Sequence, residues 1–153
     1  MGLFDWASLR PGQRRDDPLV SPGLFGARAD LPPAVFLIGC ELDVLAYEAW
    51  RAACRLAGRR VPGLDEPVGR AEPGGEGELV TAGDERFAWE EAAADGSRVR
   101  WLLVPDTVHG FDQRNIARLV GGDPALLEDA RVKTAKVMDS VAEWLLSGPL
   151  RKA

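Results

Sequence analysis

The chain has 153 residues, of which 46% are hydrophobic and 28% are charged, and this is the size and composition of one folded domain. Its 24 acidic residues outnumber its 19 basic ones, and the net charge of −5 argues against a nucleic-acid-binding surface, which needs a basic excess. No apolar run approaches the roughly 20 residues of a membrane-spanning helix. The sequence holds a single histidine, His109, so proton transfer near neutral pH must use that residue or a group from another chain.

The start of the sequence and its cysteines favour a reducing compartment. Asp5 and Arg10 interrupt the apolar run that a secretory leader would need. The two cysteines, Cys40 and Cys54, form neither a close metal pair nor a disulfide framework, and we expect them to be buried free thiols. We therefore expect a cytoplasmic protein.

The first half of the chain predicts an irregular arm, a strand and a helix. In residues 1–33 prolines and glycines recur too often for a regular element. The apolar run over residues 34–39 predicts a strand that is covered on both faces, as in parallel sheets. From Val44 to Ala57 apolar residues recur at helical spacing, and Gly58 is placed to end that helix.

Residues 59–98 predict a loop or hairpin insertion. The stretch 59–78 is rich in glycine, proline and glutamate and predicts a mobile loop. Two short β-like runs follow, at 78–82 and 86–90. Because they are separated by a glycine and Asp84, they predict a small hairpin.

The last third of the chain predicts a second buried strand and a long helix. The strand covers residues 99–104, and the helix between the two strong strands favours a parallel pair joined by a right-handed crossover. Asp123 and Pro124 are typical of a helix N-cap and first turn, and Gly148 and Pro149 would end that helix. The predicted fold class is α/β.

Ionisable side chains follow both predicted strands. Glu41 and Asp43 come after the first strand, and Asp106 and His109 come after the second. Ligands and catalytic groups of such sheets lie beyond the carboxyl ends of the strands, so Asp43 and His109 can meet there. A carboxylate that accepts one ring N–H leaves the other ring nitrogen free to act as a base. The alternatives are a structural role for His109, a helix N-cap role for Asp43, and loop roles for Glu41 and Asp106.

Four stretches of the sequence resemble, in order, the C-terminal half of the α/β-hydrolase family. They are DPLVSP at 17–22, LPPAVF at 31–36, ELDVL at 41–45 and HGF at 109–111. The resemblance is greatest to the hormone-sensitive-lipase-like carboxylesterases, the fold-3 α/β hydrolases, and to fungal members in particular, and it runs from about Asp17 to Leu146. It implies that Asp43 is the acid and His109 the base of a catalytic triad.

The same resemblance implies the end of a three-layer sandwich that acts on a small ester without cofactor or metal. Two parts of the family's machinery have no counterpart here: the G-x-S-x-G elbow that carries the nucleophile, and the H-G-G-type oxyanion element. The five serines lack the flanking glycines of an elbow; they are Ser8, Ser21, Ser97, Ser140 and Ser147. We therefore expect a truncated C-terminal domain that is not a competent esterase alone.

Three further hypotheses come from the residues. If the N-terminal half of such a domain is missing, one strand of the remaining sheet has an edge of unpaired N–H and C=O groups. Such an edge predicts a non-catalytic binding or assembly module that can self-associate. A hydrolase that uses Cys40 as its nucleophile is the second, although no elbow pattern surrounds that cysteine. The third is a metal site at Asp106, His109 and Asp112, which are spaced three residues apart, although a single histidine argues against it.

Overall fold

The structure, a computed structural model, describes residues 12, 14, 28, 31–113 and 115–148, so most of the predicted irregular arm lies outside the described residues. In chain order the elements are β1 (Ala34–Cys40), α2 (Ala46–Leu56), β2 (Ala88–Ala92), β3 (Arg98–Val104), α3 (Ile116–Leu119) and α4 (Pro124–Ser147). Among these elements, no helix has the length and apolar character needed to cross a membrane.

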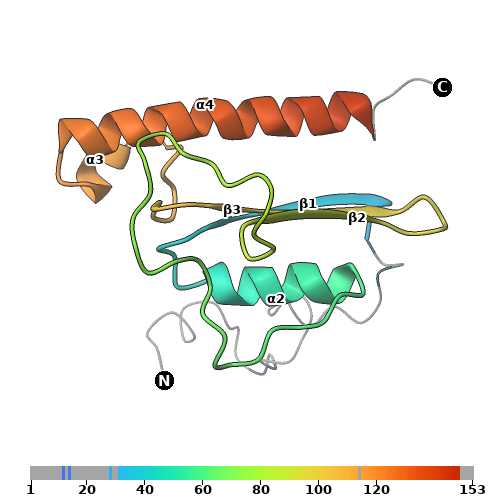
Figure 1. The fold of residues 1–153 in the computed structure, drawn as a ribbon. Helices are drawn as coiled ribbons and strands as arrows, with labels where there is room; N and C mark the ends of the chain where they lie inside the picture. Colours follow the sequence, from blue (N-terminus) through green and yellow to red (C-terminus); the bar gives the residue numbers. More distant parts are fainter. Residues whose placement is uncertain (1–11, 13, 15–27, 29–30, 114, 149–153) are drawn as a thin grey trace.

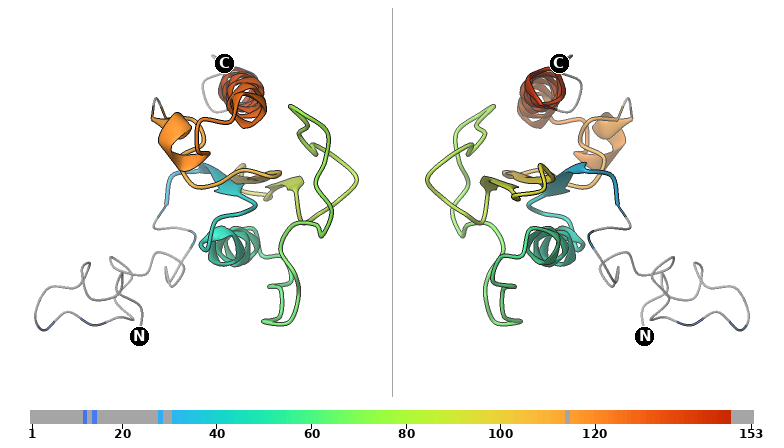
Figure 2. Two further views of the ribbon diagram at one scale, coloured as in Figure 1. Left: turned by 90° about the vertical axis from the view of Figure 1, so that its left-hand side faces the viewer. Right: turned by 90° about the vertical axis from the view of Figure 1, so that its right-hand side faces the viewer.

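The three strands form one mixed sheet that lies between two helices (Figure 1). The strand order is β1-β3-β2, with β1 parallel and β2 antiparallel to β3. Seen end-on in Figure 2, α2 covers one face of the sheet and α4 covers the other. The predicted α/β class is confirmed, and so is the predicted parallel pair of strands with a helix between them in sequence.

Strand β3 is the central strand, and its side chains alternate between two cores. Trp101 and Leu103 belong to the core on the α2 side, whereas Leu102 and Val104 belong to the core that contains Val137 of α4. The buried indole of Trp101 donates to the carbonyl oxygen of Arg86 at 2.8 Å, so its one polar atom has a partner. Strand β3 is therefore buried on both faces. The cover on both faces that the apolar run 34–39 predicts for β1 is not found, because most of its side chains are half-buried and Ile38 is 40% exposed.

Helix α2 begins two residues later than predicted, and it ends where the glycine predicts. Its N-cap is Leu45, which makes no side-chain cap bond. At the other end Gly58 has a φ of +68°, which glycine adopts without a Cβ penalty. The Gly58 N–H donates to the Arg55 carbonyl at 3.2 Å and the Arg59 N–H to the Cys54 carbonyl at 2.9 Å. These two bonds are those of a Schellman motif.

Helix α4 is the long helix that the sequence predicts. The Asp123 carboxylate accepts the N–H of Ala125 at 2.8 Å, and Pro124 in the first turn has no N–H that needs a partner. Gly148 is the C-cap residue. Both predicted ends of this helix are therefore confirmed.

The predicted hairpin is wrong. Residues 78–82 form no strand, and β2 at Ala88–Ala92 pairs instead with β3. The connecting turn contains Gly96 with a φ of +82° and an Asp95 carboxylate that accepts the Ser97 N–H at 2.9 Å. A two-stranded hairpin alone is marginally stable, whereas pairing with β3 covers the second edge of a buried strand.

Residues 59–87 contain no helix or strand, and polar contacts attach them to the carboxyl end of β3 and to α4. Arg70 donates to the carboxylate of Asp106 at 3.0 Å, just after β3. The Gly77 N–H donates to the carboxylate of Asp129 in α4 at 2.6 Å. The segment thus bridges the sheet and the long helix.

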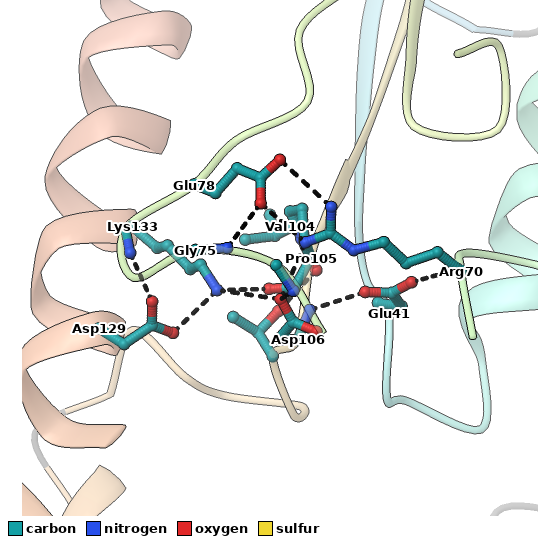
Figure 3. A network of polar contacts seen from close by, with 12 residues as sticks. Glu41, Arg70, Gly75, Glu78, Val104, Pro105, Asp106, Asp129 and Lys133 are labelled. Carbon is teal, nitrogen blue, oxygen red and sulfur yellow. Dashed lines mark hydrogen bonds and ion pairs between the residues drawn. The ribbon is translucent and has the colours of Figure 1, made fainter. Parts of the chain in front are cut away.

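The side chain of Lys133 attaches α4 to the end of β3. It is only 1% exposed, and its Nζ donates to the Pro105 carbonyl and pairs with the Asp129 carboxylate, each at 2.8 Å (Figure 3). A buried charge is tolerated only when it is paired and hydrogen-bonded, and both conditions hold here.

We expect Lys133→Met to lower the free energy of unfolding by about 3 kcal/mol, because the largely enclosed Asp129 carboxylate loses its cation and the Pro105 carbonyl loses its donor. The control is Arg131→Met, which breaks an exposed ion pair with Glu128 and is expected to change stability by less than about 1 kcal/mol. Urea unfolding followed by tryptophan fluorescence measures both values. Equal losses in the two variants would contradict the structural role of Lys133.

Arg70 makes the fold sensitive to acid through Glu78. Its hydrogen bonds to Glu78, helped by the N–H of Gly75, lower the pKa of that carboxyl from the ordinary value of 4.5. Because the pKa is lower in the folded chain, the stabilisation is fully present above the unfolded pKa and is lost as pH falls through the folded value. We expect Glu78→Gln to destabilise the chain at neutral pH and to have little effect in strong acid.

Urea midpoints measured from neutral to acid pH test this expectation. In an Arg70→Met background the same Glu78→Gln substitution is expected to lose most of its effect, because the cation that shifts the carboxyl is gone. A pH-independent difference between the wild type and Glu78→Gln would contradict the assignment.

Candidate active site

Asp43 and His109 are in contact at the carboxyl ends of β1 and β3. Nδ1 of His109 lies 2.7 Å from Oδ2 of Asp43, although the two residues are 66 positions apart in the sequence. An ionised carboxylate only accepts hydrogen bonds, so the proton of this contact lies on Nδ1 and the lone pair of the neutral ring on Nε2. The structure thus brings together the two residues that the strand order predicted would meet.

The acid of this pair is enclosed and the base is open. The side chain of Asp43 is 12% exposed, whereas that of His109 is 74% exposed. Because Nδ1 contacts Asp43, Nε2 is the ring nitrogen that could exchange a proton with another molecule.

Asp43 is held by the turn that leads into α2. Its Oδ1 accepts the N–H of Leu45 at 3.0 Å, and its backbone carbonyl accepts the N–H of Ala46 at 3.0 Å. The prediction that Asp43 is the N-cap of a helix from Val44 is wrong, since the N-cap is Leu45. The carboxylate closes the turn before the helix with one oxygen and contacts His109 with the other.

The three residues of the H-G-F turn have different structural roles. His109 is exposed, Gly110 has a φ of +74° that favours glycine, and Phe111 is 6% exposed within the core on the α4 side. The Phe111 N–H also donates to the Val108 carbonyl at 3.2 Å. The buried phenyl ring therefore anchors the turn that presents His109.

Backbone hydrogen bonds join the two turns that carry the pair. The Glu41 N–H donates to the Val104 carbonyl at 3.0 Å, and the Leu42 N–H donates to the Thr107 carbonyl at 2.9 Å. Thr107 is buried, and its hydroxyl donates to the Val104 carbonyl at 2.9 Å. The parallel ladder thus continues past the ends of both strands.

A pocket of about 420 Å³ opens beside the pair, and residues of β1, α2, α4 and the H-G-F turn line it. Its apolar lining includes Ile38, Leu45, Ala49, Phe111, Val137 and Met138. The volume is within the range of small-molecule sites, and the lining suits an apolar group next to His109.

No serine lines this pocket among the residues that the structure describes. Ser97 lies in the turn between β2 and β3, and Ser140 and Ser147 belong to α4. Ser8 and Ser21 lie outside the described residues.

Cys40 lines the pocket, but its thiol is not activated. Burial raises the pKa of the Cys40 thiol. A hydrogen bond with Thr107 opposes this rise in part, and the nearby carboxylates of Asp43 and Asp112 add to it. The thiolate is the nucleophilic form of cysteine, and these surroundings disfavour it. The structure therefore argues against the hypothesis of a Cys40 nucleophile.

The spacing of Asp106, His109 and Asp112 does not produce a metal-binding cluster. Within the described part of the chain, no group of three or more His, Cys, Asp and Glu side chains could hold a metal ion. The Asp106 carboxylate binds Arg70 and the Gly74 N–H instead, at 3.0 and 3.1 Å.

Sequence reasoning missed the part that Glu41 plays at this edge. The sequence predicts a loop role for Glu41, yet the residue is only 9% exposed and accepts two backbone N–H groups from distant segments. The one available signal was its position directly after a buried strand, where a carboxylate needs partners from elsewhere in the fold.

No protein-family model matches the sequence, and no match was found among curated proteins or among solved structures. The α/β fold and the contact between Asp43 and His109 therefore rest on this chain alone.

Proposed function

We propose that the chain provides the acid–base pair of an ester-hydrolysing site of the α/β-hydrolase type, in which Asp43 orients His109. The observation that supports this proposal is the 2.7 Å contact between Nδ1 of His109 and Oδ2 of Asp43 at the ends of two adjacent parallel strands. The stretches ELDVL and HGF, which contain the pair, are two of the four that resemble the fold-3 carboxylesterases.

In this role His109 moves the protons of the reaction. Nε2 accepts the proton of an attacking hydroxyl as its oxygen bonds to the ester carbonyl carbon, and it then gives that proton to the departing alcohol. Water next attacks the acyl group in the same way and releases the acid. Asp43 stabilises the imidazolium between the two transfers. The apolar pocket next to the ring suits the hydrocarbon part of a small carboxylic ester.

The attacking hydroxyl and the oxyanion donors are assigned to another polypeptide segment. The sequence has no G-x-S-x-G elbow, and no serine lines the described pocket. Without the nucleophile the acyl-enzyme route is closed, and one oxyanion donor is typically worth ~10²–10³ in rate. The pair in this chain is thus one part of a complete site.

The single histidine makes the test direct, because His109 gives the only imidazole signals of the chain. In isotope-labelled protein the NMR shifts of the ring nitrogens report which nitrogen carries the proton. We expect the neutral ring of the wild type to be the Nδ1–H tautomer and Asp43→Ala to favour Nε2–H. Asp112→Ala removes an exposed acid from the neighbouring turn and is expected to leave the tautomer unchanged. An Nε2–H wild type would refute the pairing.

The same preparation is expected to turn over no alkyl ester and to take no label from a fluorophosphonate probe for activated serines. Both results follow from the missing nucleophile. Robust ester turnover by the pure chain would contradict the assignment of the hydroxyl to another polypeptide.

Strand β1 favours a second candidate function, which is assembly through the sheet edge. Among the described residues it pairs with β3 alone, and its sequence AVFLIGC contains neither a charge nor a proline that would discourage pairing. Apolar side chains near its carboxyl end are exposed: Ile38 is 40%, Leu42 62% and Leu45 51% exposed.

The partner that suits this edge is a second copy of the chain. Two antiparallel β1 strands related by a two-fold axis would bury the same apolar side chains twice, and no like charges would face each other because β1 carries none. We expect a dimer at micromolar concentration by size-exclusion chromatography with light scattering, and a monomer for Ile38→Lys. Leu64→Lys, at an 87% exposed position of the segment 59–87, is the control and should stay dimeric. A monomeric wild type would count against this candidate.

A further inference from the structure

The buried carboxylate of Glu41 joins three segments of the chain. Oε2 accepts the N–H of Asp106 at 2.8 Å, and Oε1 accepts the N–H of Arg70 at 2.6 Å (Figure 3). Asp106 follows β3, and Arg70 belongs to the segment 59–87. A buried carboxylate needs hydrogen-bond partners, and both oxygens of Glu41 obtain theirs from backbone that is distant in sequence.

Asp106 is the point at which the chain turns from β3 toward His109. It has a φ of +54° and is the one non-glycine residue of the described chain with a positive φ. This conformation is uncommon for any residue with a side chain, and surrounding contacts must hold it. Its N–H is held by Glu41, and its carboxylate is held by Arg70 and by the N–H of Gly74.

We propose that Glu41 is a positioning residue for the Asp43–His109 pair. Asp43 lies two residues after Glu41, and His109 lies three residues after Asp106, so the bond from the Asp106 N–H to Glu41 spans the two turns that carry the pair. A side-chain hydrogen bond of 2.7 Å persists only while these turns keep their spacing. This inference rests on the proposed function, because it assigns to Glu41 an action through that pair.

Gly69 gives independent support, because the space that a side chain at this position would need is filled by the Glu41 carboxylate. A Cβ at position 69 would overlap Oε1, Cγ and Cδ of Glu41, and Gly69 has a φ of +74°. Gly69→Ala therefore displaces the carboxylate without removing it. Gly83 is a matched control, since it has a φ of +87° and a Cβ there would meet nothing within 4 Å.

The tautomer of His109 tests the proposal, because it reports on the pair and not on overall stability. In Glu41→Gln the amide NH₂ faces one of the two backbone N–H donors. One of the two hydrogen bonds to residue 41 is therefore lost. We expect Glu41→Gln and Gly69→Ala to lose the majority of the Nδ1–H tautomer and Gly83→Ala to keep it. The indole N–H resonance of Trp101, in the core on the α2 side, shows whether each variant is folded.

The outcomes separate this inference from the proposed function. A folded Glu41→Gln or Gly69→Ala chain with the wild-type tautomer overturns the positioning role of Glu41. Gly69→Ala decides the question if Glu41→Gln does not fold, because it leaves the Glu41 carboxylate in the chain. If the wild type and Asp43→Ala share one tautomer, the proposed function itself fails. If those two differ and the variants at positions 41 and 69 match the wild type, only the positioning role fails.

Discussion

The parallel pairing of β1 with β3 is the contact on which the candidate site depends. Cys40 lies opposite Val104 in the register, so the residues that follow the two strands leave the sheet at the same edge. Each strand has seven residues, and an antiparallel pair would have placed Asp43 and His109 about 20 Å apart at opposite ends of the strands. Two further backbone hydrogen bonds beyond the strand ends connect the turns that carry Asp43 and His109.

Several carboxylates gather at this edge, and each is compensated in a different way. Asp43 binds His109 and a backbone N–H, Glu41 binds two backbone N–H groups, and Asp106 binds Arg70. Asp129 pairs with the buried Lys133 of the same helix. The segment 59–87 has no regular secondary structure, yet it supplies Arg70 and several of the N–H donors. Phe87 of the same segment is buried in the core on the α2 side, so both charge compensation and apolar packing hold the segment against the sheet.

The pocket and the edge of β1 that no described strand covers belong to one surface. Ile38 and Leu45 line the pocket beside His109 and are also among the exposed apolar side chains of the edge. A polypeptide paired with β1 would lie next to the open side of the histidine ring. The proposed substrate pocket and the proposed assembly edge therefore share the side chains of Ile38 and Leu45.

The sequence by itself determined the strands β1 and β3, the helices α2 and α4, and the residues that leave the strand ends. These features depend on local physics: an apolar run, helical periodicity, an aspartate N-cap and a glycine that adopts positive φ. Only the tertiary structure decided the partner of β2, the raised pKa of the Cys40 thiol and the hydrogen bonds of Glu41. Each of these depends on which buried surfaces and backbone donors arrive from distant parts of the chain, and no local pattern encodes them.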